Sequence, residues 1–94
     1  MFILDITYVA PVERIDELMD EHVAWLKQGH AAGSFVAWGR KVPRTGGIVL
    51  AIGGRAEVEA VAAADPFVTS GAVTVNVIEM APSFVADGLE LLGR

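Results

Sequence analysis

The chain contains two histidines and no cysteine, so imidazole and carboxylate groups are its main candidates for proton chemistry. His22 recurs with apolar residues at the three- and four-residue spacing of one helix face, namely Ile15, Met19 and Leu26. That spacing predicts that His22 points towards the core rather than towards solvent. There it could act as an acid or a base, or it could be a core-edge histidine that hydrogen-bonds to the backbone.

Asp65 is the carboxylate that such a histidine would need. It stands in the segment ADPFVTSG (64–71), where an alanine-rich run ends before Pro66. An Asp–Pro pair commonly opens a turn, and an aspartate at a helix end can accept hydrogen bonds from nearby backbone groups. A carboxylate beside a histidine would instead fix its tautomer and raise its basicity. The residue types alone leave both interpretations of Asp65 open.

The other polar groups give weaker indications. His30 falls near the expected end of the same helix, where it would complement the helix dipole. Arg40 could reach an anionic ligand at a pocket rim, although clusters such as Arg40, Lys41 and Arg44 are mostly solvated surface. A site with two histidines and one carboxylate would require His30 to turn inward. We therefore expect no metal ion and no external cofactor.

Size and composition favour one small domain, residues 1–94, that associates with a partner. The chain has 94 residues, of which 53% are hydrophobic, and its mean hydropathy is +0.49. A domain of this size is marginal alone, so its surplus apolar surface predicts an oligomer. The net charge of −5 argues against a nucleic-acid partner. No apolar run is long enough to span a membrane and no signal peptide is evident, so we expect a cytoplasmic protein.

Alternation and periodicity predict a series of strands and helices. Strands are expected at residues 2–9, 34–39, 47–53 and 72–80. A helix is expected from Pro11 to about residues 31–33, and an alanine-rich helix over 56–64. The second helix must end near Asp65, because a residue before proline is disfavoured in helical geometry. Residues 40–46 are typical of a hairpin-like loop, and the tail, 82–94, could form a short helix.

This order, β-α-β-β-α-β, is the split arrangement of ferredoxin-like folds. Right-handed crossovers place both helices on one face of a four-stranded antiparallel sheet, with the third strand in its interior because both of its faces are apolar. The opposite face, with Ile3, Val9 and Ile78, is too apolar to stay exposed. We expect an identical chain, related by a two-fold axis, to cover it. A small-molecule pocket is expected between a helix, the sheet and the loops.

The pattern resembles the YciI-related (YCII) family over residues 1 to about 80. One matching motif is a helix with H-x₁₀-G, here His22 to Gly33, followed by a strand that ends in Gly39. A glycine-bounded third strand and an acidic, alanine-rich helix then run into DPF-x₃-G, here Asp65 to Gly71. The DPF-x₃-G motif is the more specific of the two.

The resemblance implies a dimeric α/β barrel with a pocket in which His22 and Asp65 pair. It favours an enzyme of lyase or isomerase type, because at least one relative is described as removing chloride from a chlorinated hydroxyquinol. Arg40 and Phe67 are then the candidate substrate-binding residues. The resemblance does not imply which small molecule is bound.

Two features depart from the family pattern. Arg40 stands where the family commonly has proline, and EMAPSF (79–84) replaces the usual lysine-proline-aromatic ending. Both lie at the expected pocket rim or dimer edge, so they bear on the substrate rather than on the fold. The rival to an enzyme is a ligand-binding or accessory dimer whose pocket binds without turnover. A cofactor-free monooxygenase or muconolactone-isomerase-like barrel shares the fold, but no matching sequence pattern is evident.

Overall fold

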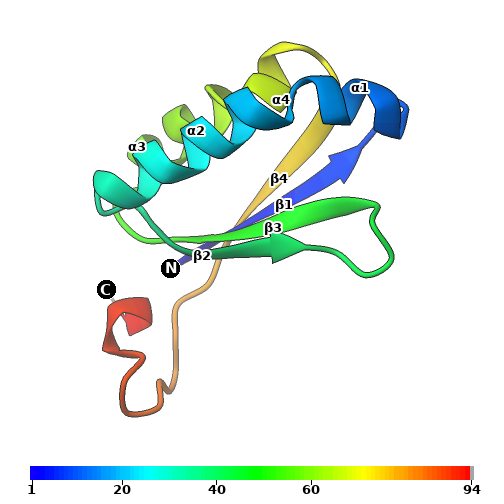
Figure 1. The fold of residues 1–94 in the computed structure, drawn as a ribbon. Coiled ribbons are helices and arrows are strands. Elements are labelled where there is room, and N and C mark those ends of the chain that lie inside the picture. Colours follow the sequence, from blue (N-terminus) through cyan, green and yellow to red (C-terminus); the bar gives the residue numbers. More distant parts are fainter. Residues whose placement is uncertain (94) are drawn as a thin grey trace.

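Four antiparallel strands form one sheet in the order β2-β3-β1-β4 (Figure 1). The computed structural model describes residues 1–93. The strands are β1 (Phe2–Tyr8), β2 (Phe35–Arg40), β3 (Gly46–Ala51) and β4 (Val73–Glu79). The predicted ferredoxin-like α+β fold is therefore confirmed, and the third strand lies in the sheet interior as expected.

The helices lie on one face of this sheet (Figure 1). They are α1 (Val12–Glu17), α2 (Met19–Ala31), α3 (Arg55–Ala63) and α4 (Pro66–Thr69). The first helix was expected to be continuous, but it is interrupted at Leu18, whose N–H bonds to the carbonyls of both Arg14 and Ile15. Such shared bonds tighten a helical turn. The His22 N–H still bonds to the Leu18 carbonyl, so the apolar stripe continues across the break. Within residues 1–93, no helix combines the length and the hydropathy needed to cross a bilayer.

The short helix α4 was not predicted from the sequence. Pro66 occupies its first turn, where a missing backbone N–H leaves no hydrogen bond unmade. Asp65 is the N-cap residue, and its side chain accepts the backbone N–H of Phe67 at 3.0 Å. The Asp–Pro pair therefore ends the helical run of α3, as expected, and also begins the next helix.

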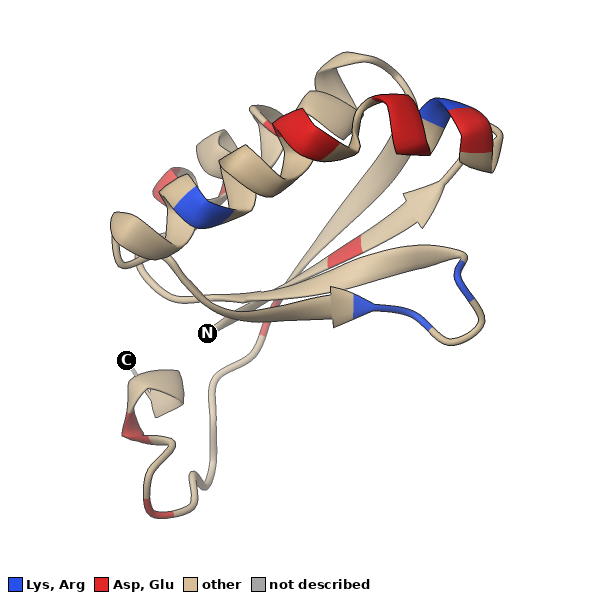
Figure 2. Cartoon of the chain, in the orientation of Figure 1, with Lys and Arg blue, Asp and Glu red and all other residues tan. Residues whose placement is uncertain are grey.

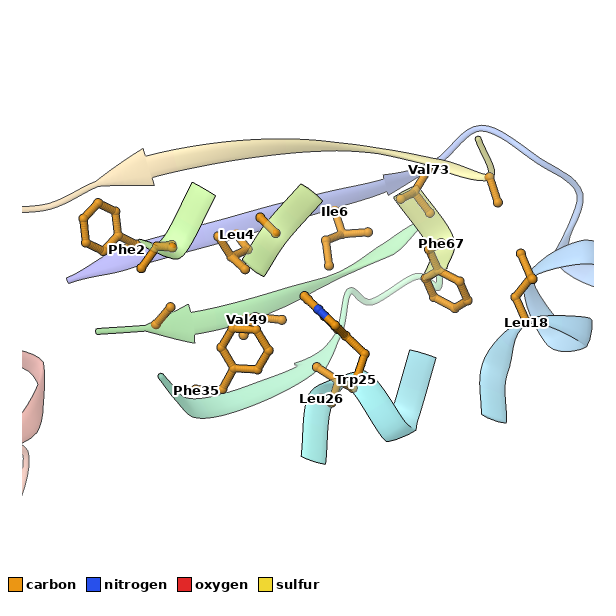
Figure 3. Packing of buried hydrophobic residues seen from close by; sticks show 14 of the residues in the cluster. Phe2, Leu4, Ile6, Leu18, Trp25, Leu26, Phe35, Val49, Phe67 and Val73 are labelled. Atoms are coloured by element: carbon orange, nitrogen blue, oxygen red, sulfur yellow. The ribbon is translucent and has the colours of Figure 1, made fainter. Parts of the chain in front are cut away.

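The core lies between the helices and the inner face of the sheet (Figure 3). Phe2, Leu4 and Ile6 of β1 are buried there, and Leu4 is paired with Val49 of β3 and Val77 of β4. The alternation predicted for β4 follows this register, since Val73, Val75 and Val77 pair with the inward-facing positions of β1. The main helical contributions come from Ile15, Leu18, Trp25, Leu26, Val58 and Phe67.

The opposite face of the sheet has no covering layer within residues 1–93 (Figure 1). Ile3 pairs there with Leu50 on one side and Ile78 on the other, and Ile78 is 41% exposed. This face also carries an ion pair, because Lys41 Nζ lies 2.6 Å from Asp5 Oδ1. Val9, which was assigned to the first strand, instead lies one residue beyond β1 and donates its N–H to the Ala72 carbonyl.

The chain that follows β4 leaves the sheet on its uncovered side, away from the helices (Figure 1). The helix predicted within 82–94 is reduced to a 3₁₀ turn, η1 (Glu90–Gly93), and residue 94 lies outside the described residues. Phe84 is 84% exposed, and Leu89 and Leu91 are about half exposed. We call residues 80–93 the tail; several of its large apolar side chains have little cover in a single chain.

The closest approach of α2 to the sheet requires Gly29. A Cβ atom at this position would overlap the ring of Phe35, which is almost completely buried. Replacing glycine by alanine in an exposed helix would stabilise it by about 1 kcal/mol, but overpacking a core costs about 1–3 kcal/mol. We predict that Gly29→Ala lowers the free energy of unfolding measured in urea.

Gln28→Ala is the control, because Gln28 is exposed on the same helix and its replacement should change that free energy by less than about 0.5 kcal/mol. A Gly29→Ala protein as stable as the wild type would mean that the Phe35 ring has room to move.

Candidate functional site

A histidine near the start of α2 meets the aspartate that caps α4. His22 Nδ1 lies 2.8 Å from Asp65 Oδ1, a distance that fits a hydrogen bond. Both residues are buried, with exposures of 8% for His22 and 1% for Asp65. The two residues are 43 positions apart in the chain. The structure thus brings together the two residues that the sequence singled out.

One oxygen atom of Asp65 serves two donors. Oδ1 accepts the backbone N–H of Phe67 and faces Nδ1 of His22. An ionised carboxylate can only accept hydrogen bonds, so His22 donates from Nδ1. In the neutral ring the proton is then on Nδ1, and Nε2 carries the lone pair. Nε2 is therefore the ring atom with the capacity to accept a proton.

The second carboxylate oxygen, Oδ2, is enclosed and has no hydrogen-bond donor among residues 1–93. Burial of a charged group is costly unless it is paired and hydrogen-bonded. The contact with His22 therefore stabilises the fold, whether or not it also serves a reaction, because His22 is the side chain that donates to this carboxylate. Loss of the imidazole would leave Asp65 with the Phe67 N–H alone.

Aromatic rings fix the plane of the imidazole. The ring of Phe67 is stacked on His22, with a centroid distance of 3.8 Å and an interplanar angle of 6°. Trp25 lies 5.4 Å from the same ring, and its Nε1 donates to the Val61 carbonyl at 3.0 Å. Tyr8 meets Phe67 edge-on. Phe67, a candidate substrate-binding residue, is therefore also a support for the histidine.

His22 lines a hollow of about 170 Å³ between α2 and the inner face of the sheet. Cavities of roughly 150 Å³ can hold a benzene molecule, so this space suits one small ring. Most of the lining is apolar or aromatic, and the side chains other than His22 and Phe67 include Ile6, Tyr8, Met19, Leu26, Trp38 and Val49. Gly46 also lines it; a Cβ atom there would overlap the Ile6 carbonyl, so this position must stay without a side chain.

Arg40 lies at the rim of this hollow, as expected. It is exposed at the end of β2 and forms no salt bridge with residues 1–93. Its two basic neighbours on the hairpin (Figure 2) are already paired, Lys41 with Asp5 and Arg44 with Asp16. The hydrogen bond with Asp16 raises the pKa of Arg44 above its ordinary value. Arg40 is therefore the cation of this cluster that is available to a ligand.

His30 takes no part in the hollow. It is exposed, and its Nδ1 lies 3.0 Å from the carbonyl oxygen of Phe35. His30 lies in the last turn of α2, as expected, and this contact also links the end of α2 to the start of β2. In the part of the chain that the structure describes, no three histidine, aspartate or glutamate side chains gather as a metal site.

Tyr8, Met19 and Trp38 were not singled out from the sequence as lining residues. For Tyr8 the signal was present, because it alternates with Phe2, Leu4 and Ile6 on the inner face of β1. For Trp38 it was hidden, because a bulge between Phe35 and Ala37 shifts the register of β2.

Comparison with known proteins places the chain in a family. The family model of the YCII-related domain matches residues 1–81. The chain belongs to the YCII-related family. No curated protein matches it. The family match ends where the tail begins, so most of the tail lies outside the shared domain.

A solved structure with a similar fold is 5-chloro-2-hydroxyhydroquinone dehydrochlorinase (TftG) from Burkholderia phenoliruptrix AC1100, in complex with 2,5-dihydroxybenzoquinone. The TM-score is 0.69 at 18% sequence identity, and the match covers 85% of this chain and 93% of that chain. At this level of identity the comparison shows a shared fold.

Removal of the Asp65 side chain should destabilise the protein. Asp65→Ala removes an N-cap, worth about 1 kcal/mol, and leaves a buried imidazole N–H without an acceptor, which costs about 1–3 kcal/mol. We predict that the free energy of unfolding in urea falls by about 2–4 kcal/mol. Asp65→Asn keeps an oxygen for both donors and should cost less.

Asp20→Ala, exposed on α2, is the matched control and should change this free energy by less than about 0.5 kcal/mol. Equal stability of Asp65→Ala and the wild type would show that the carboxylate contributes nothing to the fold.

Proposed function

We propose that this protein is a small-molecule enzyme of lyase or isomerase type that uses His22 for proton transfer. The observation that carries this proposal is the buried His22–Asp65 hydrogen bond beside a hollow. It ties Nδ1 to a carboxylate and leaves Nε2 as the basic nitrogen. A group whose tautomer and ring plane are both fixed in this way is suited to repeated proton transfer.

In the proposed reaction, Nε2 of His22 removes a proton from a carbon or hydroxyl group of the bound substrate. The electron pair of the broken bond enters the substrate ring system. In a lyase reaction a leaving group on the substrate departs with its own electron pair, and in an isomerase reaction the imidazolium returns the proton to another atom. The carboxylate of Asp65 stabilises the imidazolium while the proton is held.

The substrate class that we propose is a single small ring with an acidic hydroxyl or carboxylate group. The size and apolar lining of the hollow favour one ring, and Phe67 contributes to the wall beside the imidazole. Arg40 offers a guanidinium at the rim, a group that matches oxyanions well. The name and the bound ligand of TftG, a dihydroxybenzoquinone, support the same class.

Turnover should depend on His22. In assays of a panel of catechols, lactones and halogenated phenols, we predict that His22→Ala lowers kcat by about 10²- to 10⁴-fold. Arg14→Ala is the control, because Arg14 pairs with Glu17 on the exposed side of α1. Asp65→Asn should lower kcat less than His22→Ala does, because its oxygen still accepts from Phe67 and can still accept from Nδ1.

Arg40→Ala should raise KM for anionic substrates and leave kcat nearly unchanged, because Arg40 binds the substrate and does not transfer the proton. Binding of these compounds without turnover by the wild type would contradict the enzyme and support the ligand-binding dimer instead.

We also propose that the active form is a homodimer in which the two uncovered sheet faces meet. The partly exposed apolar residues of this face, such as Ile3, Leu50 and Ile78, support this arrangement, because surplus apolar surface on a small domain favours association. We predict a dimer mass by size exclusion with light scattering at low micromolar concentration. A stable monomer at that concentration would contradict the proposal.

A further inference from the structure

The tail has no role in the proposed chemistry, yet it contains regular hydrogen-bonded turns. Its N–H groups form local turns, from Leu89 to the Ala86 carbonyl and from Leu92 to the Leu89 carbonyl. Glu90 accepts the Gly88 N–H at 3.0 Å. Its largest apolar side chain, Phe84, nevertheless projects into solvent. A segment with hydrogen-bonded turns and exposed apolar side chains is suited to packing on a surface of another chain.

A second hollow lies at the β2 edge of the uncovered face, and it could receive such a segment. Its lining residues are Ala37, Trp38, Gly39, Arg40, Ile48 and Leu50. Four of these, Trp38, Gly39, Arg40 and Ile48, also line the hollow beside His22. Whatever covers the second hollow therefore contacts the wall of the first.

The geometry of a face-to-face dimer brings the tail to this place. When the two-fold axis runs parallel to the strands, the β4 edge of one sheet lies over the β2 edge of its partner. Stacked sheets are about 10 Å apart. Phe84 follows the end of β4 by five residues, which can span up to roughly 17 Å. The tail already leaves the sheet on the uncovered side (Figure 1).

We propose that the tail of each subunit packs on the β2 edge of its partner and completes the partner's site. Phe84 and the tail leucines cover the residues of the second hollow that face away from the helices, namely Ala37, Ile48 and Leu50. The tail and the second hollow are thus complementary in hydropathy. This inference rests on the proposed homodimer and adds a partner segment to its site.

Engineered disulfides test this contact, because the chain has no cysteine of its own. Protein with Ala37→Cys is mixed with protein that carries Ser83→Cys, and the mixture is oxidised. A covalent heterodimer is expected, because each tail lies on the partner's β2 edge. Glu59→Cys, exposed on α3, replaces Ala37→Cys in the control mixture and should give no heterodimer. A chain with both substitutions, diluted in excess cysteine-free chain, should form no internal disulfide.

A second measurement does not depend on cysteines. The triple variant Phe84→Ser, Leu89→Ser and Leu91→Ser should raise the dimer dissociation constant by about tenfold or more. Val42→Ser, at an exposed loop position, is the control and should leave the dissociation constant unchanged.

The outcomes separate this inference from the proposed function. A dimer with no Ala37–Ser83 disulfide, and with an unchanged dissociation constant in the triple variant, overturns the tail contact and leaves the homodimer intact. An internal disulfide also overturns it, because the tail would then lie on its own sheet. A monomeric wild type overturns the tail contact and the homodimer together, while turnover that depends on His22 would leave the proton chemistry standing.

Discussion

The candidate site depends on one atom, Oδ1 of Asp65, that accepts from a backbone N–H and from an imidazole. The backbone bond belongs to the first turn of α4, so the folding of four residues fixes the carboxylate. The imidazole comes from α2, so the same atom joins two helical segments. A helix cap and a proton-transfer pair are usually separate features. Here the residue that caps a short helix also fixes the imidazole of His22, so replacing Asp65 would disturb both contacts.

The packing around this atom holds the histidine in place. Phe67 is stacked on the ring of His22, and its N–H is one of the two donors to Asp65. On the other end of α2, the contact of Gly29 with Phe35 sets the distance between the helix and the sheet. Gly46 allows the close approach of β3 to the Ile6 carbonyl beside the hollow. The site is thus a product of close packing at both ends of one helix.

Local patterns predicted the strand order, the helical face of His22 and the end of α3, because each depends on periodicity or on proline geometry. The pairing of His22 with Asp65 spans 43 positions, so the residue types alone left it open and the family resemblance favoured it. A helix of four residues such as α4 has too weak a periodic signal to predict. The break at Leu18 and the hydrogen bond of His30 depend on tertiary contacts. Most of the tail lies outside the family match, so its hydrophobicity could be predicted from the sequence and its location could not.

The ion pair between Lys41 and Asp5 has a consequence for the sheet face on which it lies. The two opposite charges are 2.6 Å apart; Asp5 is paired with Ile48 and Asn76, and Lys41 donates to Thr7. Removing such a pair from water is expensive unless its remaining hydrogen-bonding capacity is met. A purely apolar surface, such as an aggregation-prone strand or a lipid acyl chain, cannot supply the hydrogen bonds that this pair still needs. This face therefore favours partner surfaces that bring water or a polar group to the middle of the sheet, and disfavours purely apolar ones.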